Sequence, residues 1–244
     1  MKYIIANWKL NGSKLLLNEF VNQFSSYNPH NLIVLCPPYL FLNFAEKFNC
    51  IDNFSIGSQN VSEYDNGAFT GEISAEMLAE NQIDYSIVGH SERRSLLEET
   101  DEKINVKIKQ LLNHHITPIL CVGENIEQRN AHTFKQIIDL QLDKAFKNIK
   151  INSRQIIIAY EPLWSIGTGV TPEISQINET HDFIRTKMKQ LYPKNVNQFK
   201  IIYGGSVNLK NYHIILSSKA VDGVLVGGAS LDSKSFYEIG NFKI

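Results

Sequence analysis

The fold is decided by the stretch Ala159-Tyr160-Glu161-Pro162-Leu163-Trp164-Ser165-Ile166-Gly167-Thr168-Gly169. The apolar run that precedes it, 156–158, is typical of a buried strand. This strand ends on the carboxylate of Glu161, and Pro162 then stops both strand and helix. Apolar residues on the loop that follows make sense if the loop closes over a ligand, so we expect a lid beside a catalytic base. A surface glutamate before an ordinary strand-to-helix loop is the alternative.

Strands and helices alternate from this stretch outward in both directions. Short apolar runs predict strands at 3–7, 32–36, 54–59, 85–89, 116–122, 156–161, 199–203 and 222–226. Segments with helical periodicity follow them at 13–24, 39–48, 72–80, 101–114, 133–149, 171–191, 209–216 and 234–239. The sequence Thr171-Pro172-Glu173 predicts the start of one of these helices, with Thr171 as its N-cap.

Regular alternation of this kind is typical of a parallel sheet covered by helices. Eight units in 244 residues predict an α/β fold, a (β/α)8 barrel with eight parallel strands and the helices outside. We expect one domain over residues 1–244. A doubly wound open sheet is the alternative, although it usually needs fewer units.

The composition is that of an ordinary globular protein without an unusual partner. The net charge is -1, with 24 basic and 25 acidic residues, so no broad basic surface for nucleic acid is expected. The cysteines Cys36, Cys50 and Cys121 are too widely spaced to predict a zinc site or a disulfide framework. We find no signal peptide and no apolar run of membrane length, and therefore expect a cytoplasmic protein with no membrane partner.

Polar residues and glycines gather just after the predicted strands. They are Asn7, Lys9, Gln59, Asn60, His90, Cys121, Glu124, Glu161, Ser206, Gly227 and Gly228. In a parallel barrel all of these strand ends meet on one face, where the active site lies. Glycine-rich loops after the seventh and eighth strands are typical of a phosphate cradle of backbone N–H groups. The site is therefore expected to take a small phosphate ester.

The chain resembles the triosephosphate isomerases in several specific segments between residues 7 and 231. These are Asn7-Trp8-Lys9-Leu10-Asn11-Gly12, Gly67-Ala68-Phe69-Thr70-Gly71-Glu72, Val88-Gly89-His90-Ser91-Glu92-Arg93-Arg94, the opening stretch, Tyr203-Gly204-Gly205-Ser206-Val207 and Leu225-Val226-Gly227-Gly228-Ala229-Ser230. The departures are mild. Leu163 and Ser165 stand where the family more often has Val and Ala, and Leu10 where it often has Met.

This resemblance implies a TIM barrel that interconverts dihydroxyacetone phosphate and D-glyceraldehyde 3-phosphate, without cofactor or metal. This family is a well-known example of an enzyme whose acid and base groups are tuned as a pair, so the residue roles that follow are implied by the resemblance. Glu161 is expected to be the base and neutral His90 the electrophile. Lys9 is expected to supply positive charge, and Glu92 to support these residues without touching the substrate. Asn7 is expected to orient the substrate and the lysine.

The resemblance also implies how phosphate and a second subunit are bound. Gly167, Ser206 and Gly228 are expected to donate backbone N–H groups to the phosphate, Gly227 to permit the turn, and 162–168 to form the lid. The long loop 60–71 is expected to make a homodimer, with Thr70 supporting the partner's 7–9 segment.

Two alternatives remain open. One is another sugar-phosphate isomerase built on a phosphate-binding barrel, and the other is a barrel recruited as a binding protein. The first would not be expected to carry Lys9, His90 and Glu161 together, and this intact set argues against the second. Cys121 is expected to be a buried structural residue.

Overall fold

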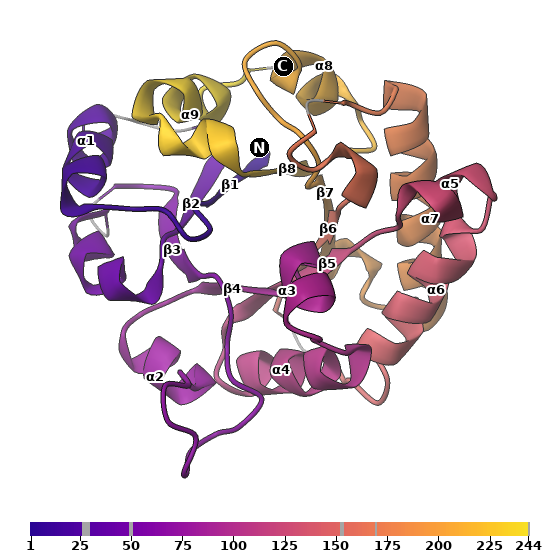
Figure 1. Cartoon of the computed structure of the whole chain (residues 1–244), viewed down its shortest axis with the longest axis horizontal. Coiled ribbons are helices and arrows are strands. Elements are labelled where there is room, and N and C mark those ends of the chain that lie inside the picture. Colours follow the sequence, from indigo (N-terminus) through magenta and orange to yellow (C-terminus); the bar gives the residue numbers. More distant parts are fainter. Residues whose placement is uncertain (26–29, 49–50, 152–153, 169, 244) are drawn as a thin grey trace.

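The computed structural model describes residues 1–25, 30–48, 51–151, 154–168 and 170–243, and in these residues eight strands close into a barrel (Figure 1). In chain order they are β1 Tyr3–Asn7, β2 Leu32–Cys36, β3 Phe54–Ser58, β4 Tyr85–Val88, β5 Thr117–Val122, β6 Ile156–Tyr160, β7 Phe199–Tyr203 and β8 Gly223–Val226. Every neighbouring pair is parallel, and β1 pairs with β8 to close the ring. The predicted (β/α)8 barrel is confirmed.

Helices cover the outside of this barrel (Figure 1). The α-helices of the described residues are α1 Lys14–Phe24, α2 Ala75–Glu80, α3 Ser91–Leu96, α4 Asp101–Asn113, α5 Ile126–Asn130, α6 Phe134–Ala145, α7 Ile174–Leu191, α8 Tyr212–Ser217 and α9 Ser233–Gly240. The 3-10 helices are η1 Tyr39–Phe41, η2 Asn43–Phe48, η3 Leu163–Ser165, η4 Val196–Gln198 and η5 Gly228–Leu231. Among the described residues, no helix has both the length and the apolar composition that a membrane crossing requires.

The start of α7 corrects one prediction. Thr171 is not the N-cap, because Glu173 takes that position and forms a reciprocal capping box with Gln176. This box satisfies two of the backbone donors that a helix start leaves open. The hydroxyl of Thr171 instead accepts a hydrogen bond from Nδ2 of Asn211, at 2.9 Å.

Other helix predictions were wrong in kind or missing. The segment 39–48 forms two 3-10 turns, because its bonds close over three residues, as from the Leu42 N–H to the Tyr39 carbonyl. Helix α5 was not among the predicted elements, although the Asn125–Gln128 capping box marks its start. Cys50 and Gly169 lie outside the described residues.

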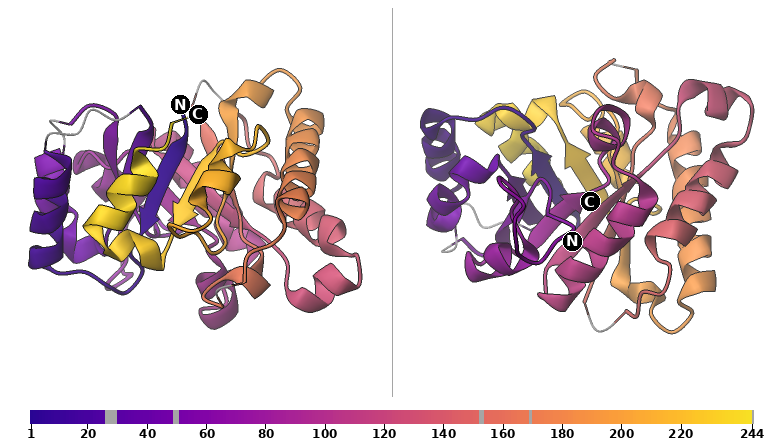
Figure 2. Two further views of the ribbon diagram at one scale, coloured as in Figure 1. Left: turned by 90° about the horizontal axis from the view of Figure 1, so that it is seen from above. Right: turned by 60° about the horizontal axis from the view of Figure 1, so that its bottom comes forward.

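Side chains of the strands alternate between the inside of the barrel and the layer under the helices. Ile157 and Ala159 of β6 belong to the inner cluster, and Tyr160 belongs to the outer one. Glu161 therefore continues the inner row beyond the end of β6. In the left view of Figure 2 the N-terminus lies at one end of the barrel and α3, in magenta, at the other. The strand ends that carry the expected site residues are at the α3 end.

The buried histidine of α7 makes the stability of this fold depend on pH. His181 is completely buried, with Nδ1 3.2 Å from the Ala220 carbonyl, and burial lowers its pKa to about 4. In the unfolded chain the same side chain takes up a proton near its ordinary pKa of 6.5. Its contribution to stability is therefore complete above about pH 6.5 and is lost as the pH falls towards 4.

We expect the free energy of unfolding to fall more in the wild-type protein than in His181→Asn over this pH window. The difference should be on the order of 3 kcal/mol. Urea unfolding between pH 7 and 4 measures it, with His30→Asn, at an exposed histidine, as the control. Identical pH profiles for wild type and His181→Asn would contradict the assignment.

Candidate active site

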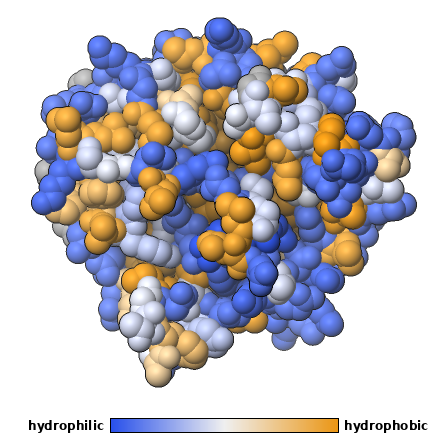
Figure 3. All heavy atoms as spheres, in the orientation of Figure 1, coloured by the Kyte–Doolittle hydropathy of each residue, from blue (hydrophilic) through white to orange (hydrophobic). Residues whose placement is uncertain are grey.

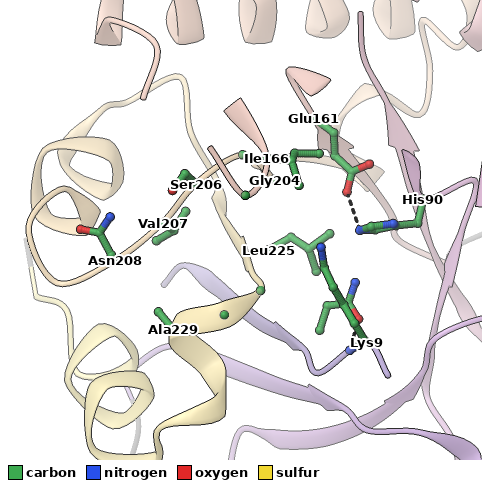
Figure 4. Close-up of a pocket in the computed structure, with 15 residues that line it drawn as sticks. Lys9, His90, Glu161, Ile166, Gly204, Ser206, Val207, Asn208, Leu225 and Ala229 are labelled. Carbon is green, nitrogen blue, oxygen red and sulfur yellow. Dashed lines mark hydrogen bonds and ion pairs between the residues drawn. The ribbon is translucent and has the colours of Figure 1, made fainter. Parts of the chain in front are cut away.

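A cavity of about 290 Å³ lies at the carboxyl ends of the strands (Figure 4). Its lining includes the eight residues that were expected to be catalytic or to bind substrate: Asn7, Lys9, His90, Glu161, Gly167, Ser206, Gly227 and Gly228. Hydrophilic and hydrophobic residues are mixed around the centre of this face in the space-filling view (Figure 3). Within the described residues, no group of three or more His, Cys, Asp or Glu side chains is arranged to hold a metal ion.

Glu161 presents a buried carboxylate to this cavity. The residue is 1% exposed, and Oε2 accepts a hydrogen bond of 3.0 Å from the Ser91 N–H. Oε1 lies 3.2 Å from Nε2 of His90, yet it has no aligned hydrogen bond among the described residues (Figure 4). Gly204 makes room for the side chain, since a Cβ there would lie 2.9 Å from Cγ of Glu161. The result is a carboxylate with a free lone pair on the cavity side.

His90 is oriented by the start of α3, for which it is the N-cap residue. Its Nδ1 accepts a 3.2 Å hydrogen bond from the backbone N–H of Glu92, so this nitrogen carries a lone pair. The proton of the neutral ring is then on Nε2. Because Nε2 faces Glu161 and the cavity, His90 can donate a hydrogen bond to a bound oxygen.

Lys9 follows β1 in a backbone conformation that is unusual for a residue with a side chain. Its φ is 53°, in the left-handed region, where such residues are strained. The Lys9 N–H donates to Oδ1 of Asn7 at 3.0 Å, and Nε1 of Trp8 donates to the Ser230 carbonyl at 3.0 Å. These bonds hold the segment while Nζ of Lys9 pairs with Oε1 of Glu92 at 2.6 Å. A cation is thereby fixed beside His90.

The opposite side of the cavity is made of backbone. Gly227 and Gly228 follow β8, and Gly228 begins η5, while Ser206 follows β7. Gly167 joins them from the lid with a φ of 71°, a conformation that favours glycine. Backbone N–H groups at such turns and helix starts suit an anion such as phosphate.

The sequence did not reveal how the lid is anchored. Trp164 of the lid donates from Nε1 to Oε1 of Glu124 at 3.2 Å. Glu124 is completely buried, and the same oxygen accepts hydrogen bonds from Nε of Arg129 and from the Tyr160 hydroxyl, at 2.9 and 3.0 Å. Glu124 was expected at a strand end, but no sequence signal pointed to its partners, which are 5 to 40 residues away.

Comparison with known proteins agrees with this geometry. The family model described as "Triosephosphate isomerase" matches residues 2–243. A triosephosphate isomerase of Francisella tularensis subsp. mediasiatica (strain FSC147) is 40% identical over 243 residues, which cover 98% of this chain and 96% of that protein. A triosephosphate isomerase of Aquifex aeolicus (strain VF5) is 42% identical over 241 residues, which cover 98% of each chain.

The buried pair under the lid should matter for stability far more than an exposed pair. We expect Glu124→Gln to lower the free energy of unfolding by about 3 kcal/mol, because the guanidinium of buried Arg129 is left without its countercharge. Glu179→Gln, which removes an exposed ion pair with Lys135, should lower it by less than about 1 kcal/mol. Urea unfolding at pH 7 measures both, and equal losses would contradict the expectation.

Proposed function

Because the chain belongs to the triosephosphate isomerase family, we propose that Glu161, His90 and Lys9 carry out the reaction of that family in this cavity. The chain is an aldose–ketose isomerase that interconverts dihydroxyacetone phosphate and D-glyceraldehyde 3-phosphate. The reaction moves a proton between neighbouring carbons through an enediol or enediolate, while a hydroxyl proton passes between the oxygens that these two carbons carry. The observation that supports these roles best is the 3.2 Å approach of Oε1 of Glu161 to Nε2 of His90 inside the cavity.

Glu161 is the base in this proposal. Its Oε1 is buried and has no aligned hydrogen-bond partner among the described residues, so it is available for a proton bound to substrate carbon. The Ser91 N–H holds the other oxygen at 3.0 Å. After taking the proton from one carbon, the carboxylic acid returns it to the neighbouring carbon, which restores the carboxylate.

His90 and Lys9 stabilise the negative charge that develops on the substrate oxygens. His90 donates the hydrogen bond from Nε2, because Nδ1 is occupied by the Glu92 N–H. Lys9 supplies the fixed positive charge, and Asn7 holds the lysine backbone in place. Donors arranged before the reaction stabilise such charge without reorganising in the transition state.

The phosphate group lies on the backbone side of the cavity. Gly167, Ser206 and Gly228 donate N–H groups to it, and Gly227 permits the close turn. The lid 162–168 closes over it and excludes water, which protects the enediolate. Trp164 leaves the buried Glu124 when the lid moves.

We also propose that the protein is a homodimer in which each subunit inserts its 60–71 loop into the other. The loop projects from the lower edge of the molecule in Figure 1, and its surface is pale to orange in Figure 3. Tyr64 and Phe69 stack at its tip with ring centres 3.6 Å apart, although each is at least 40% exposed. Exposed apolar groups gathered in this way are typical of an interface.

The groove that is proposed to receive this loop lies beside the active site. Its volume is about 450 Å³, and its apolar lining includes Leu10, Tyr39, Leu96 and Leu97. Leu10 is 98% exposed and Leu96 75%, so both would gain from cover by a partner. The groove shares Asn7, Lys9 and His90 with the catalytic cavity, which brings the partner's Thr70 near the 7–9 segment. A two-fold dimer uses loop and groove twice.

We further propose that residues 1–244 form one domain and that the protein works in the cytoplasm, in glycolysis and gluconeogenesis. The closed ring of strands from β1 to β8 supports the single domain.

Glu161→Gln should lower kcat by at least about 100-fold, because the amide cannot accept the proton from carbon. The conversion of D-glyceraldehyde 3-phosphate, followed as dihydroxyacetone phosphate without added metal or nucleotide, measures the effect. Glu127→Gln, at an exposed position of α5, is the matched control and should keep its kcat. A Glu161→Gln enzyme with near-normal turnover would remove Glu161 as the base.

Phe69→Asp should raise the dissociation constant of the dimer by about 30-fold or more, because it places a charge on a buried interface. Sedimentation velocity across a dilution series measures this constant. Leu140→Asp is the control, since Leu140 is 52% exposed on α6, away from the groove. A wild-type protein that is a fully active monomer would overturn the proposed dimer.

A further inference from the structure

The hydroxyl of Ser165 lies in a hydrogen-bond cluster beneath the lid. Ser165 ends η3 and is completely buried. Its Oγ is 2.7 Å from the Val170 carbonyl, 3.1 Å from the Tyr203 hydroxyl and 3.2 Å from the backbone nitrogen of Ser206. One side chain of the lid is therefore bonded both to its own loop and to the loop after β7.

The direction of each bond follows from the partners. The Val170 carbonyl can only accept, so the single hydroxyl proton of Ser165 goes there. Burial raises the pKa of Tyr203 to about 12, so the phenol keeps its proton and donates to Oγ of Ser165. The Ser206 N–H donates to the same oxygen. Both acceptor positions of the Ser165 oxygen are thus filled.

The Ser206 N–H is also one of the three donors that the proposed function assigns to the phosphate. A single N–H group cannot make two well-aligned hydrogen bonds in different directions. We propose that Ser165 is a positioning residue that competes with phosphate for the Ser206 N–H, an inference that rests on the proposed phosphate site. Without a bound anion the Ser165 hydroxyl holds this donor, and an anion must displace it.

The phosphate prevails in this competition, but it binds more weakly than it would without the hydroxyl. Hydrogen bonds to a charged acceptor are roughly twice as strong as those between neutral groups, so phosphate can take the N–H from a neutral hydroxyl. Losing the internal bond offsets part of the binding free energy. For one neutral hydrogen bond this corresponds to about a threefold to tenfold weaker affinity.

Ser165→Ala tests the inference. The substitution keeps the Cβ and introduces the residue that the family more often has at this position, so a folded protein is expected. Titration with inorganic phosphate, followed by the fluorescence of lid residue Trp164, should give a dissociation constant about threefold to tenfold lower than that of the wild type. The inhibition constant of phosphate in the isomerase assay should fall by the same factor. Ser165→Cys, whose sulfur accepts weakly, should lie between the two proteins.

The outcomes separate this inference from the proposed function. Ser217→Ala removes an exposed hydroxyl of α8 that donates to the His213 carbonyl, and it should bind phosphate like the wild type. Wild-type protein without saturable phosphate binding would overturn the proposed anion site and the competition with it. Wild-type binding with unchanged or weaker binding in Ser165→Ala would overturn the competition alone, because a merely structural serine would loosen the site when removed.

Discussion

The alternation of side chains along the strands of a closed parallel barrel is the constraint on which the rest of this structure depends. Tyr3 and Ile5 of β1 point into the barrel, and Asn7 follows them in the same row. In β6, Ile157 and Ala159 precede Glu161 in the same way. Residues at the rim are thus positioned by apolar packing below them. The groups that line the cavity therefore have a rigid support.

Two buried carboxylates near the cavity, those of Glu124 and Glu161, have opposite electrostatic surroundings. Glu124 shares one oxygen among the guanidinium of Arg129, the Tyr160 hydroxyl and Trp164, so its charge is compensated. Glu161 is equally buried, but within the described residues it has no lysine or arginine partner, and the Ser91 N–H, the Cys121 thiol and His90 approach it instead. Compensation suits an anchor that must stay charged. Its absence suits the role proposed for Glu161, which requires the group to change its protonation during the reaction.

Local sequence signals predicted the strands well and the helix ends less well. Apolar runs bounded by proline and glycine indicate strands directly, and the ends of eight parallel strands place the site residues on one face. The N-cap at Thr171 failed because its hydroxyl bonds to Asn211, 40 residues away, which no local pattern reveals. The hydrogen-bond partners of Glu124 and Ser165 were not predicted for the same reason. The chemical roles in the site came from the resemblance to a family and not from periodicity.

The pairing of β1 with β8 affects how the protein folds during its synthesis on the ribosome. Lys9 and Gly228 face the same cavity, yet they come from the two ends of the chain. Tyr3 meets its partner Gly223 only after almost all of the chain has been made, which takes on the order of ten seconds or more. Until then one edge of β1 has no native partner and can pair with other strands. The same closure that builds the cavity makes the nascent chain dependent on protection until its last strand emerges.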